Sequence, residues 1–342
     1  MKKRNILVTG GLGYIGSHTC VELIKSGYEV SIIDNLVNSE RFILDRIEKI
    51  SGEKINFYEI DIKDLDETRS CFKNKNFDLV IHFAALKSVN ESVIFPDRYY
   101  RNNIGSLENI LKCIELEDVG GLVFSSSCTV YGQPDILPVT ETSPLKKAES
   151  PYAETKQICE KIIKEFATIN KKPSISLRYF NPVGAHESGL IGELPRGVPD
   201  NLVPYITQTA IGKRDKLKIF GDDYNTKDGT PIRDYIHVVD LAEAHVSAVD
   251  RLINDETKDN YEFYNVGTGT GYSVLEVIKS FERINKIKLS YEIVGRREGD
   301  IESIYSDNKL SSKTLNWRAI RDLDQMMKSA WIWEKKFNES DS

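Results

Sequence analysis

A tyrosine and a lysine one helical turn apart could carry acid–base chemistry in this sequence. Tyr152 and Lys156 stand in the stretch SPYAETKQ. A tyrosine hydroxyl, with a pKa of about 10, is a weak base at neutral pH, but a nearby lysine cation favours the phenolate. Such a tyrosine can accept a proton from a sugar or alcohol hydroxyl while hydride leaves the carbon. The alternative is a pair of ordinary surface residues.

The position of the pair on its helix favours a functional role. Ser150 is a plausible N-cap and Pro151 suits a first turn, which predicts a helix over 151–169. At about 100° per residue, Lys156 falls on the apolar stripe with Tyr152, and a lysine that faces a core needs a partner or a function. Lys156 should be the one charged residue on this stripe. The other polar residues are expected on the opposite side: Glu154, Gln157, Glu160, Lys161, Lys164 and Glu165.

A third polar group is expected where the preceding strand ends, because α/β sheets bind ligands at the carboxyl ends of their strands. The stretch VFSSSCTVYG places Ser125, Ser126 and Ser127 there. One of these hydroxyls could bridge the tyrosine oxygen and a substrate hydroxyl. The spacing alone does not choose among the three.

A glycine-rich turn near the N-terminus predicts dinucleotide binding. Gly10, Gly13 and Gly16 follow a strand-like run and open a helix-like one. Glycines in that context permit a tight turn and the close approach of a pyrophosphate to a helix N-terminus. Asp34 ends the next strand, where a carboxylate accepts hydrogen bonds from ribose hydroxyls and repels a 2′-phosphate. NAD is therefore favoured over NADP. A plain glycine turn and a plain strand-end aspartate are the alternatives.

The elements around these residues predict an α/β, Rossmann-type, doubly wound parallel sheet with a smaller mixed α/β C-terminal substrate lobe. Apolar runs alternate with helix-like segments up to residue 181, where the rhythm breaks into a Gly- and Pro-rich stretch. We expect an NAD-binding domain over 1–181, which a segment around 233–270 could rejoin, and a substrate-binding lobe over 182–342. The expected strands, buried on both faces, are 5–9, 29–34, 55–60, 78–84, 121–126 and 174–179. Later elements are a helix at 238–253, a strand at 263–269 and a helix at 322–337.

Composition narrows the class. The 342 residues carry a net charge of −6 with a pI near 5.6, which argues against general nucleic-acid binding. The five cysteines form no CxxC pair, so neither a disulfide framework nor a metal site is predicted and a reducing cytoplasm fits best. No apolar run is long enough to predict a membrane span, and the short apolar start is not typical of a signal peptide.

Several longer stretches carry a resemblance to a known family. They are VTGGLGYIGSHT (8–19), DNLVNS (34–39), HFAALKSVNES (82–92), SSSCTVYG (125–132), SPYAETK (150–156), LRYFNPVGAHESG (177–189), RDYIHVVDLA (233–242) and RREGD (296–300). Over almost its whole length the chain resembles the extended short-chain dehydrogenase/reductase family, and within it the 4-epimerases of UDP-hexoses. The first and fifth stretches are shared by the whole family, whereas RYFNPVGAH and RDYIHV are more specific to the epimerases.

The resemblance implies an isomerase that interconverts UDP-glucose and UDP-galactose through a 4-keto sugar, in which NAD takes hydride from C4 and Tyr152 takes the O4 proton. It implies Ser127 as the catalytic serine, Lys156 as a further contact of the nicotinamide ribose, and a homodimer joined through helices of the sheet domain. Expected NAD contacts, besides Tyr152 and Lys156, are Gly10, Gly13, Tyr14, Ile15, Gly16, Asp34, Asn35, Leu36, Val37, Asn38, Ser39, Asp61, Ile62, Phe83, Ala84, Ala85, Leu86, Lys87, Asn102 and Phe180. Expected UDP-sugar contacts are Ser127, Asn181, Asn201, Leu202, Phe220, Arg233, Tyr235, Arg297, Asp300 and Ile304.

Related activities remain as alternatives. Nucleotide-sugar dehydratases and decarboxylases resemble the chain, but they carry a carboxylate where it has Ser127, Cys128 and Thr129. A dehydrogenase that releases NADH and a redox-silent NAD-binding regulator are further readings. Ile304 stands where the family has either a bulky aromatic that excludes N-acetylated sugars or a small residue that admits them, so a UDP-GlcNAc/UDP-GalNAc or dual-specificity epimerase stays open. Asp200 replaces an expected asparagine.

Overall fold

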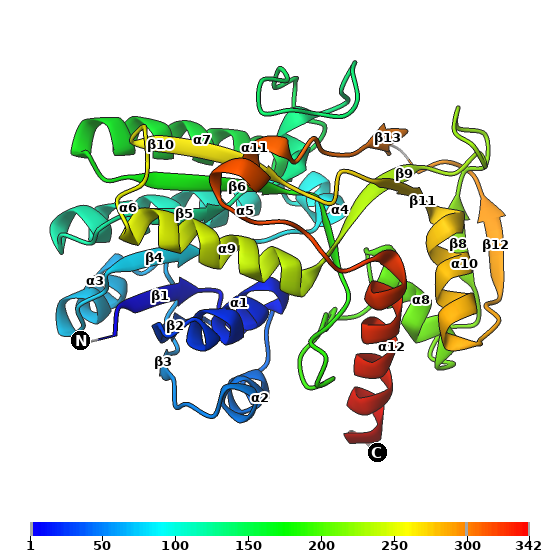
Figure 1. Cartoon of the computed structure of the whole chain (residues 1–342), viewed down its shortest axis with the longest axis horizontal. Helices are drawn as coiled ribbons and strands as arrows, with labels where there is room; N and C mark the ends of the chain where they lie inside the picture. Colours follow the sequence, from blue (N-terminus) through cyan, green and yellow to red (C-terminus); the bar gives the residue numbers. More distant parts are fainter. Residues whose placement is uncertain (1–2, 298–299, 341–342) are drawn as a thin grey trace.

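The structure is a computed structural model that describes residues 3–297 and 300–340. Within these ranges seven strands form one parallel sheet in the order β10-β6-β5-β4-β1-β2-β3 (Figure 1). They are β1 (Asn5–Thr9), β2 (Glu29–Ile33), β3 (Asn56–Tyr58), β4 (Leu79–His82), β5 (Leu122–Ser125), β6 (Ser174–Tyr179) and β10 (Tyr261–Val266). The strand order reverses between β1 and β4, which opens a ligand crevice at the carboxyl end of β1.

Helices cover both faces of this sheet, because alternate strand residues point to opposite sides and both sides are apolar. One face packs against α1 (Tyr14–Lys25), α2 (Phe42–Ser51) and α9 (Val238–Ile253), and Figure 1 shows α1 and α9 side by side. The opposite face packs against α3 (Leu65–Asn74), α6 (Gly105–Leu116) and α7 (Pro151–Asn170). Leading into α6 are α4 (Val89–Ile94), α5 (Pro96–Tyr99) and the π-helical turn η1 (Tyr100–Ile104).

The second lobe is smaller and mixed. In the described part of the chain, β7 (Asn181–Val183), β9 (Ile232–His237), β11 (Gly271–Ser273) and β13 (Ser303–Ile304) form one sheet, and β8 (Leu217–Phe220) pairs with β12 (Tyr291–Val294). A separate apolar core joins them to α8 (Leu202–Ala210), α10 (Val274–Asn285) and α12 (Leu323–Ser340). The remaining elements are the 3-10 turn η2 (Cys128–Tyr131) and α11 (Lys309–Thr314).

The predicted fold class is confirmed, and most element bounds agree with the sequence to within two residues. The strand expected at 263–269 lies at Tyr261–Val266, and it is the outermost strand of the large sheet, paired in parallel with β6. The expectation that every strand is buried on both faces is wrong for β3, whose three residues are only half-buried because β3 is an edge strand. The division of the chain at residue 181 stays a prediction. Across the described ranges no helix combines the length and apolar character needed to cross a membrane.

Candidate active site

The helix α7 presents Tyr152 and Lys156 to the interior. Its start is fixed by Ser150, whose Oγ accepts a hydrogen bond from the Ala153 backbone N–H at 3.2 Å, and by Pro151 in the first turn. Tyr152 is 8% exposed and Lys156 is 3% exposed. The prediction that this lysine lies on the buried stripe is therefore confirmed.

Lys156 spans the gap between α7 and the end of β5. Its Nζ donates to the Ser125 carbonyl oxygen at 2.7 Å and lies 4.8 Å from the centre of the Phe124 ring. The same Nζ is 5.8 Å from the centre of the Tyr152 ring. Burial lowers the pKa of Lys156 from 10.5 to about 8. The ammonium form is thus retained at neutral pH, close to the tyrosine it can influence.

Tyr152 is held in an environment that opposes ionisation. Burial raises the pKa of its hydroxyl well above the usual value, and the neighbouring Tyr179 adds to the rise. A hydrogen bond with the Ser127 side chain acts in the opposite direction and lowers the pKa. Because desolvation dominates, a phenolate at Tyr152 requires positive charge close by, and the Lys156 Nζ lies 5.8 Å from the centre of the ring.

The three serines after β5 have three different partners. The Ser125 Oγ lies 2.7 Å from the Tyr179 hydroxyl, and the Ser126 Oγ donates to Glu160 at 2.5 Å. Ser127 caps η2, and its Oγ accepts a hydrogen bond from the Thr129 Oγ1 at 3.0 Å. Of the three serines, Ser127 is the one whose side chain lowers the pKa of Tyr152.

One prediction about α7 is wrong. Glu160 was expected on the solvent side, yet it is 5% exposed and lies at the edge of the buried stripe. The reason is a partner on β6: the Arg178 Nη2 lies 2.6 Å from the Glu160 Oε2, and the Arg178 Nε donates to the same carboxylate. Arg178 also donates to the Tyr131 hydroxyl at 3.0 Å. Lys156 is therefore not the one charged residue that faces the core, because Glu160 shares that role.

The glycine turn is shaped for a ligand group that must approach the backbone. Gly10 adopts φ +69°, and a Cβ placed on it would lie 2.8 Å from the Ala84 backbone nitrogen. A Cβ on Gly16 would lie 2.3 Å from the Gly10 carbonyl oxygen, so this glycine lets α1 pack against the turn. The turn and the start of α1 together provide the tight backbone approach that a dinucleotide pyrophosphate requires.

Asp34 lies beside this turn with its carboxylate already oriented. Its Oδ2 accepts from the Leu12 N–H at 3.1 Å, and its Oδ1 accepts from the Leu36 N–H at 3.0 Å and the Ser39 Oγ at 2.7 Å. Leu36 adopts a left-handed φ of 58°. An aspartate held in this way can still accept hydrogen bonds from ribose hydroxyls, because each carboxylate oxygen has more than one acceptor direction. The residues present fit NAD.

The loop after β4 forms the other wall of the same crevice. The Phe83 N–H donates to the Thr9 carbonyl at 3.1 Å, and Asn103 accepts from the Leu86 N–H at 2.8 Å. Several expected NAD contacts lie on this loop or next to it, namely Ala84, Ala85, Leu86, Lys87 and Asn102, while Asp61 and Ile62 follow β3 and Phe180 follows β6. The crevice is thus lined by the carboxyl ends of neighbouring strands.

Several of the expected UDP-sugar residues lie on β9 or next to it. Asp300 lies 3.8 Å from an Arg233 nitrogen and 3.4 Å from the Arg297 Nε. The Arg297 guanidinium also lies over the Phe220 ring, 4.9 Å from its centre. Two guanidinium groups are brought together beside an aromatic ring, which is an arrangement suited to a diphosphate and a base. Asp300 holds both arginines in place.

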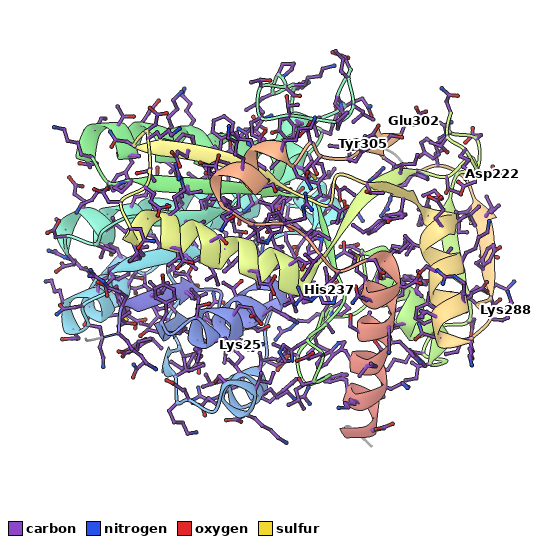
Figure 2. The ribbon with its side chains drawn as sticks, in the orientation of Figure 1. Lys25, Asp222, His237, Lys288, Glu302 and Tyr305 are labelled. Carbon is purple, nitrogen blue, oxygen red and sulfur yellow. The ribbon has the colours of Figure 1, made fainter. Side chains whose placement is uncertain are left out.

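The small sheet of the second lobe brings the expected diphosphate contact Arg233 next to further expected substrate contacts. Asn181 is the register partner of Tyr235, and Ile304 is the register partner of Arg233. Ile304 is 3% exposed and packs in an apolar cluster with Cys128 and Phe180. Figure 2 labels Glu302 and Tyr305, which flank this short strand at the end of the second lobe nearest the large sheet. Ile304 is therefore placed next to the residue that follows Ser127.

Two residues in contact with the expected site carried no recognisable signal in the sequence. Glu193 accepts hydrogen bonds from Asn201 at 2.7 Å and from Lys87 at 3.3 Å, so it joins an expected substrate residue to an expected cofactor residue. Arg196 contacts the loop after Asp34. Both lie in the Gly- and Pro-rich stretch without helical or strand period, and their contacts depend on how that stretch folds.

Comparisons with known proteins agree on the relatives of this chain. Residues 7–330 match the sequence model of the GDP-mannose 4,6 dehydratase family. A UDP-glucose 4-epimerase from Pasteurella multocida is 50% identical over 332 residues, which cover 97% of each chain, and one from Drosophila melanogaster is 47% identical over 98% of each. A crystal structure of UDP-glucose 4-epimerase from Bifidobacterium longum in complex with NAD+ and UDP superposes with a TM-score of 0.93 at 44% identity, covering 97% of this chain and 98% of that one.

The dehydratase name of the sequence model does not describe this site, since Ser127, Cys128 and Thr129 offer no carboxylate after β5. The full-length relatives instead carry the epimerase name, and their identity of about half extends through both lobes. The fold of the chain agrees with these relatives. The chain is a member of the UDP-glucose 4-epimerase family.

Proposed function

We propose that the protein interconverts UDP-glucose and UDP-galactose by inverting C4 of the hexose, with NAD as a cofactor that is regenerated in each turnover. The observation that carries this proposal is the buried set of Tyr152, Lys156 and Ser127 at the carboxyl end of β5, where positions 127–129 hold serine, cysteine and threonine rather than a carboxylate. A tyrosine base serves hydride transfer, whereas elimination of water needs a further acid. Membership of the epimerase family supports the same activity.

Each catalytic residue has a physical task. Ser127 hydrogen-bonds Tyr152 and offers its hydroxyl to the O4 of the hexose. The Lys156 ammonium stabilises the phenolate of Tyr152, which takes the O4 proton as the 4-keto sugar forms and later returns it. When bound, NAD supplies the reversible acceptance of hydride at C4. In each turnover O4 loses one proton and C4 loses one hydride. The hydride then returns to the opposite face of C4, and the proton returns to O4.

Inversion requires the 4-keto sugar to turn over without leaving. We infer that Arg233 and Arg297 hold the diphosphate and that Phe220 contacts the uracil side, so that the part of the substrate that does not react supplies the binding energy. The hexose then rotates about its phosphate linkage. The proposed sugar pocket is lined by Tyr152, Ser127, Asn181 and Ile304, and it makes few specific contacts with the rotating ring.

A coupled assay tests the proposed activity. Purified protein given UDP-galactose should form UDP-glucose with no net accumulation of NADH. Tyr152→Phe should fold and retain NAD but lose activity by about 10²- to 10⁴-fold, the usual contribution of a positioned acid–base group. Sustained NADH release, stoichiometric with substrate, would contradict epimerisation and favour a dehydrogenase. Binding of NAD without any turnover would favour a regulator.

We also propose that the protein forms a homodimer through the helices α4 and α7. Val93, Ile94 and Phe95 are 62%, 67% and 54% exposed, next to one another and beside α7, and contiguous exposed apolar side chains mark interaction sites. Ile94→Glu should convert a dimer to a monomer in light scattering, whereas Ile320→Glu, at an equally exposed isoleucine of the second lobe, should not. A monomeric wild-type protein would refute the proposal. The cytoplasm stays the predicted location, and five free, buried cysteines support a reducing compartment.

A further inference from the structure

Residues 190–201, which we call the crossing segment, run from the second lobe across the carboxyl end of the large sheet. On one side the crossing segment contacts the loop after β2 through a single guanidinium. The Arg196 guanidinium donates to the backbone carbonyl oxygens of Val37 at 2.6 Å, Leu36 at 3.1 Å and Ser39 at 3.0 Å. It also forms an ion pair with the Glu40 carboxylate at 2.9 Å.

On the other side the crossing segment contacts the loop after β4. Asp200 accepts hydrogen bonds from the Ser88 Oγ at 2.8 Å and the Asn90 Nδ2 at 3.1 Å. Glu193 accepts from the Lys87 Nζ at 3.3 Å. The aspartate that departs from the family pattern at position 200 is thus used to anchor the crossing segment to the sheet domain.

These two sets of contacts lie on opposite sides of the cofactor crevice. β2 and β4 both pair with β1, one on each side, so the glycine turn that follows β1 lies between the two contacted loops. The crossing segment is therefore fixed on both walls of the crevice. Arg196 in addition acts on Asp34, because the Leu36 N–H and the Ser39 Oγ that orient the Asp34 carboxylate belong to the loop that Arg196 holds.

The contacts of Arg196 are more than a surface ion pair. Exposed ion pairs contribute little, and the Arg196 and Glu40 side chains are 52% and 44% exposed. Hydrogen bonds from a charged donor to carbonyl oxygens are stronger, and here one planar group makes three of them. Leu36 adopts a left-handed φ of 58°. A residue other than glycine keeps this conformation only when the surrounding structure holds it.

We propose that Arg196 is a positioning residue for the cofactor, which holds loop 36–40 and Asp34 closed on the adenosine ribose and so slows the loss of NAD. The inference rests on the proposed function in that NAD is the dinucleotide. Within the crossing segment Glu193 accepts a hydrogen bond from Asn201 at 2.7 Å, and Asn201, at the end of the segment, is one of the expected UDP-sugar contacts. Uridine diphosphate that fixes this end of the crossing segment therefore slows NAD release further. By linkage, any factor by which UDP raises the equilibrium affinity for NAD is also the factor by which NAD raises the affinity for UDP.

The experiment measures NAD release rather than catalysis. NAD-loaded wild type, Arg196→Ala, Arg196→Lys and Glu40→Gln are mixed with excess isotopically labelled NAD, and exchange is followed with and without UDP. Arg196→Ala should release NAD about tenfold faster, equivalent to about 1.4 kcal/mol, and UDP should slow it less than it slows wild type. Arg196→Lys should be intermediate, because an ammonium cannot match the planar fork. Glu40→Gln should stay within twofold of wild type.

The matched control is Arg283→Ala, which removes an exposed arginine paired with Asp324 in the second lobe, away from the crevice. It should exchange NAD at the wild-type rate. Unchanged NAD release in Arg196→Ala, or an undiminished effect of UDP, would overturn the proposal. The proposed function fails differently: a wild type that holds NAD and shows these rates, yet does not convert UDP-galactose, would refute epimerisation and leave the role of Arg196 intact.

Discussion

At the scale of single residues, the buried charge of Lys156 lowers the stability of the folded state. Its ammonium is buried between α7 and β5, with a pKa lowered to about 8 by desolvation, and its Nζ donates to a backbone carbonyl. A methionine of similar length would fill the same space without the cost of a buried charge. This cost supports the proposal that Lys156 serves Tyr152 rather than stability.

This reasoning predicts a pH-dependent gap in stability between wild type and Lys156→Met. Below pH 8 the lysine is protonated in both states and the folded state bears the full cost of its charge, roughly 3 kcal/mol from the pKa difference. Between about pH 8 and 10.5 the unfolded chain binds one more proton, so wild type gains stability relative to Lys156→Met as pH rises. Urea unfolding at pH 7, 9 and 10.5 measures the gap. A constant gap would contradict the buried ammonium.

A second prediction at this scale is that the side chain at position 304 limits the size of the hexose that the enzyme accepts. Ile304 packs against Cys128 and Phe180 beside the proposed sugar pocket. Ile304→Tyr should lower kcat/KM for UDP-GlcNAc relative to UDP-glucose, and Ile304→Ser should raise it, each by about 10- to 100-fold because a few methylenes are worth about 1–3 kcal/mol. Wild type should fall between them. Equal substrate ratios in all three proteins would show that another wall limits the pocket.

The positions of the site residues could be predicted where they depend on the local sequence pattern of one element. They were missed where they depend on contacts between distant parts of the chain. The positions of Tyr152 and Lys156 follow from the period of one helix and its cap. Glu160 lies on the same helix, near the border between the two faces, and only Arg178 on β6 decides which way it points. Arg196 could not be found at all, because its partners lie far back in the sequence on a loop with no period of its own.

At the scale of elements, α7 is tied to the sheet by the buried pair of Glu160 and Arg178. Both side chains are about 95% buried, and the pair extends through Tyr131 to Asn265 on β10 at 2.6 Å. The Glu160 carboxylate also accepts from the Ser126 hydroxyl, next to Ser127. The orientation of α7 and the positions of the serines after β5 thus depend on one polar network.

The effects of mutating Glu160 and Arg178 on the free energy of unfolding should be strongly non-additive. Glu160→Leu or Arg178→Met alone leaves a buried charge without its partner and should cost about 3–5 kcal/mol of unfolding free energy. The double variant removes both charges and should cost less than either single change. A double-mutant cycle by urea denaturation measures the coupling. Additive losses would show that the two charges are stabilised separately.

Element boundaries followed from the sequence because each buried strand is a short apolar run between turns. The strand β3 is the exception, since an edge position cannot be distinguished from a central one by composition alone. The place of β10 in the large sheet depends on pairing across a long separation, with Tyr261 opposite Ser174. No local pattern encodes that register, although the apolar run itself was visible.

At the scale of the whole molecule, the histidines make the fold acid-sensitive. The sequence contains five, and every one is buried with a pKa lowered by desolvation from 6.5. Figure 2 labels His237 where α9 meets the second lobe, and its Nε2 lies 3.0 Å from the Ser329 Oγ on α12. The pKa values fall to about 3 for His18, His82 and His237 and to about 4 for His186 and His245.

Unfolding should therefore take up as many as five protons between about pH 6.5 and 4. A group whose folded pKa is lowered stays neutral in the fold but charges in the unfolded chain, so stability is full above pH 6.5 and falls as pH drops. Circular dichroism against pH should show a steep, cooperative loss near pH 5. His245→Leu, which removes one buried ring, should make the transition less steep by about one proton. Equal stability at pH 7 and 5 would contradict this.

The parallel pairing of β10 with β6 also sets an order of events during synthesis. The outer edge of β6 (Ser174–Tyr179) stays without its neighbour until residue 266 has left the ribosome, after β7, β8, β9 and α9 have been made. An unpaired strand edge is a template for association with other chains. The large sheet therefore cannot be completed before most of the second lobe has been synthesised.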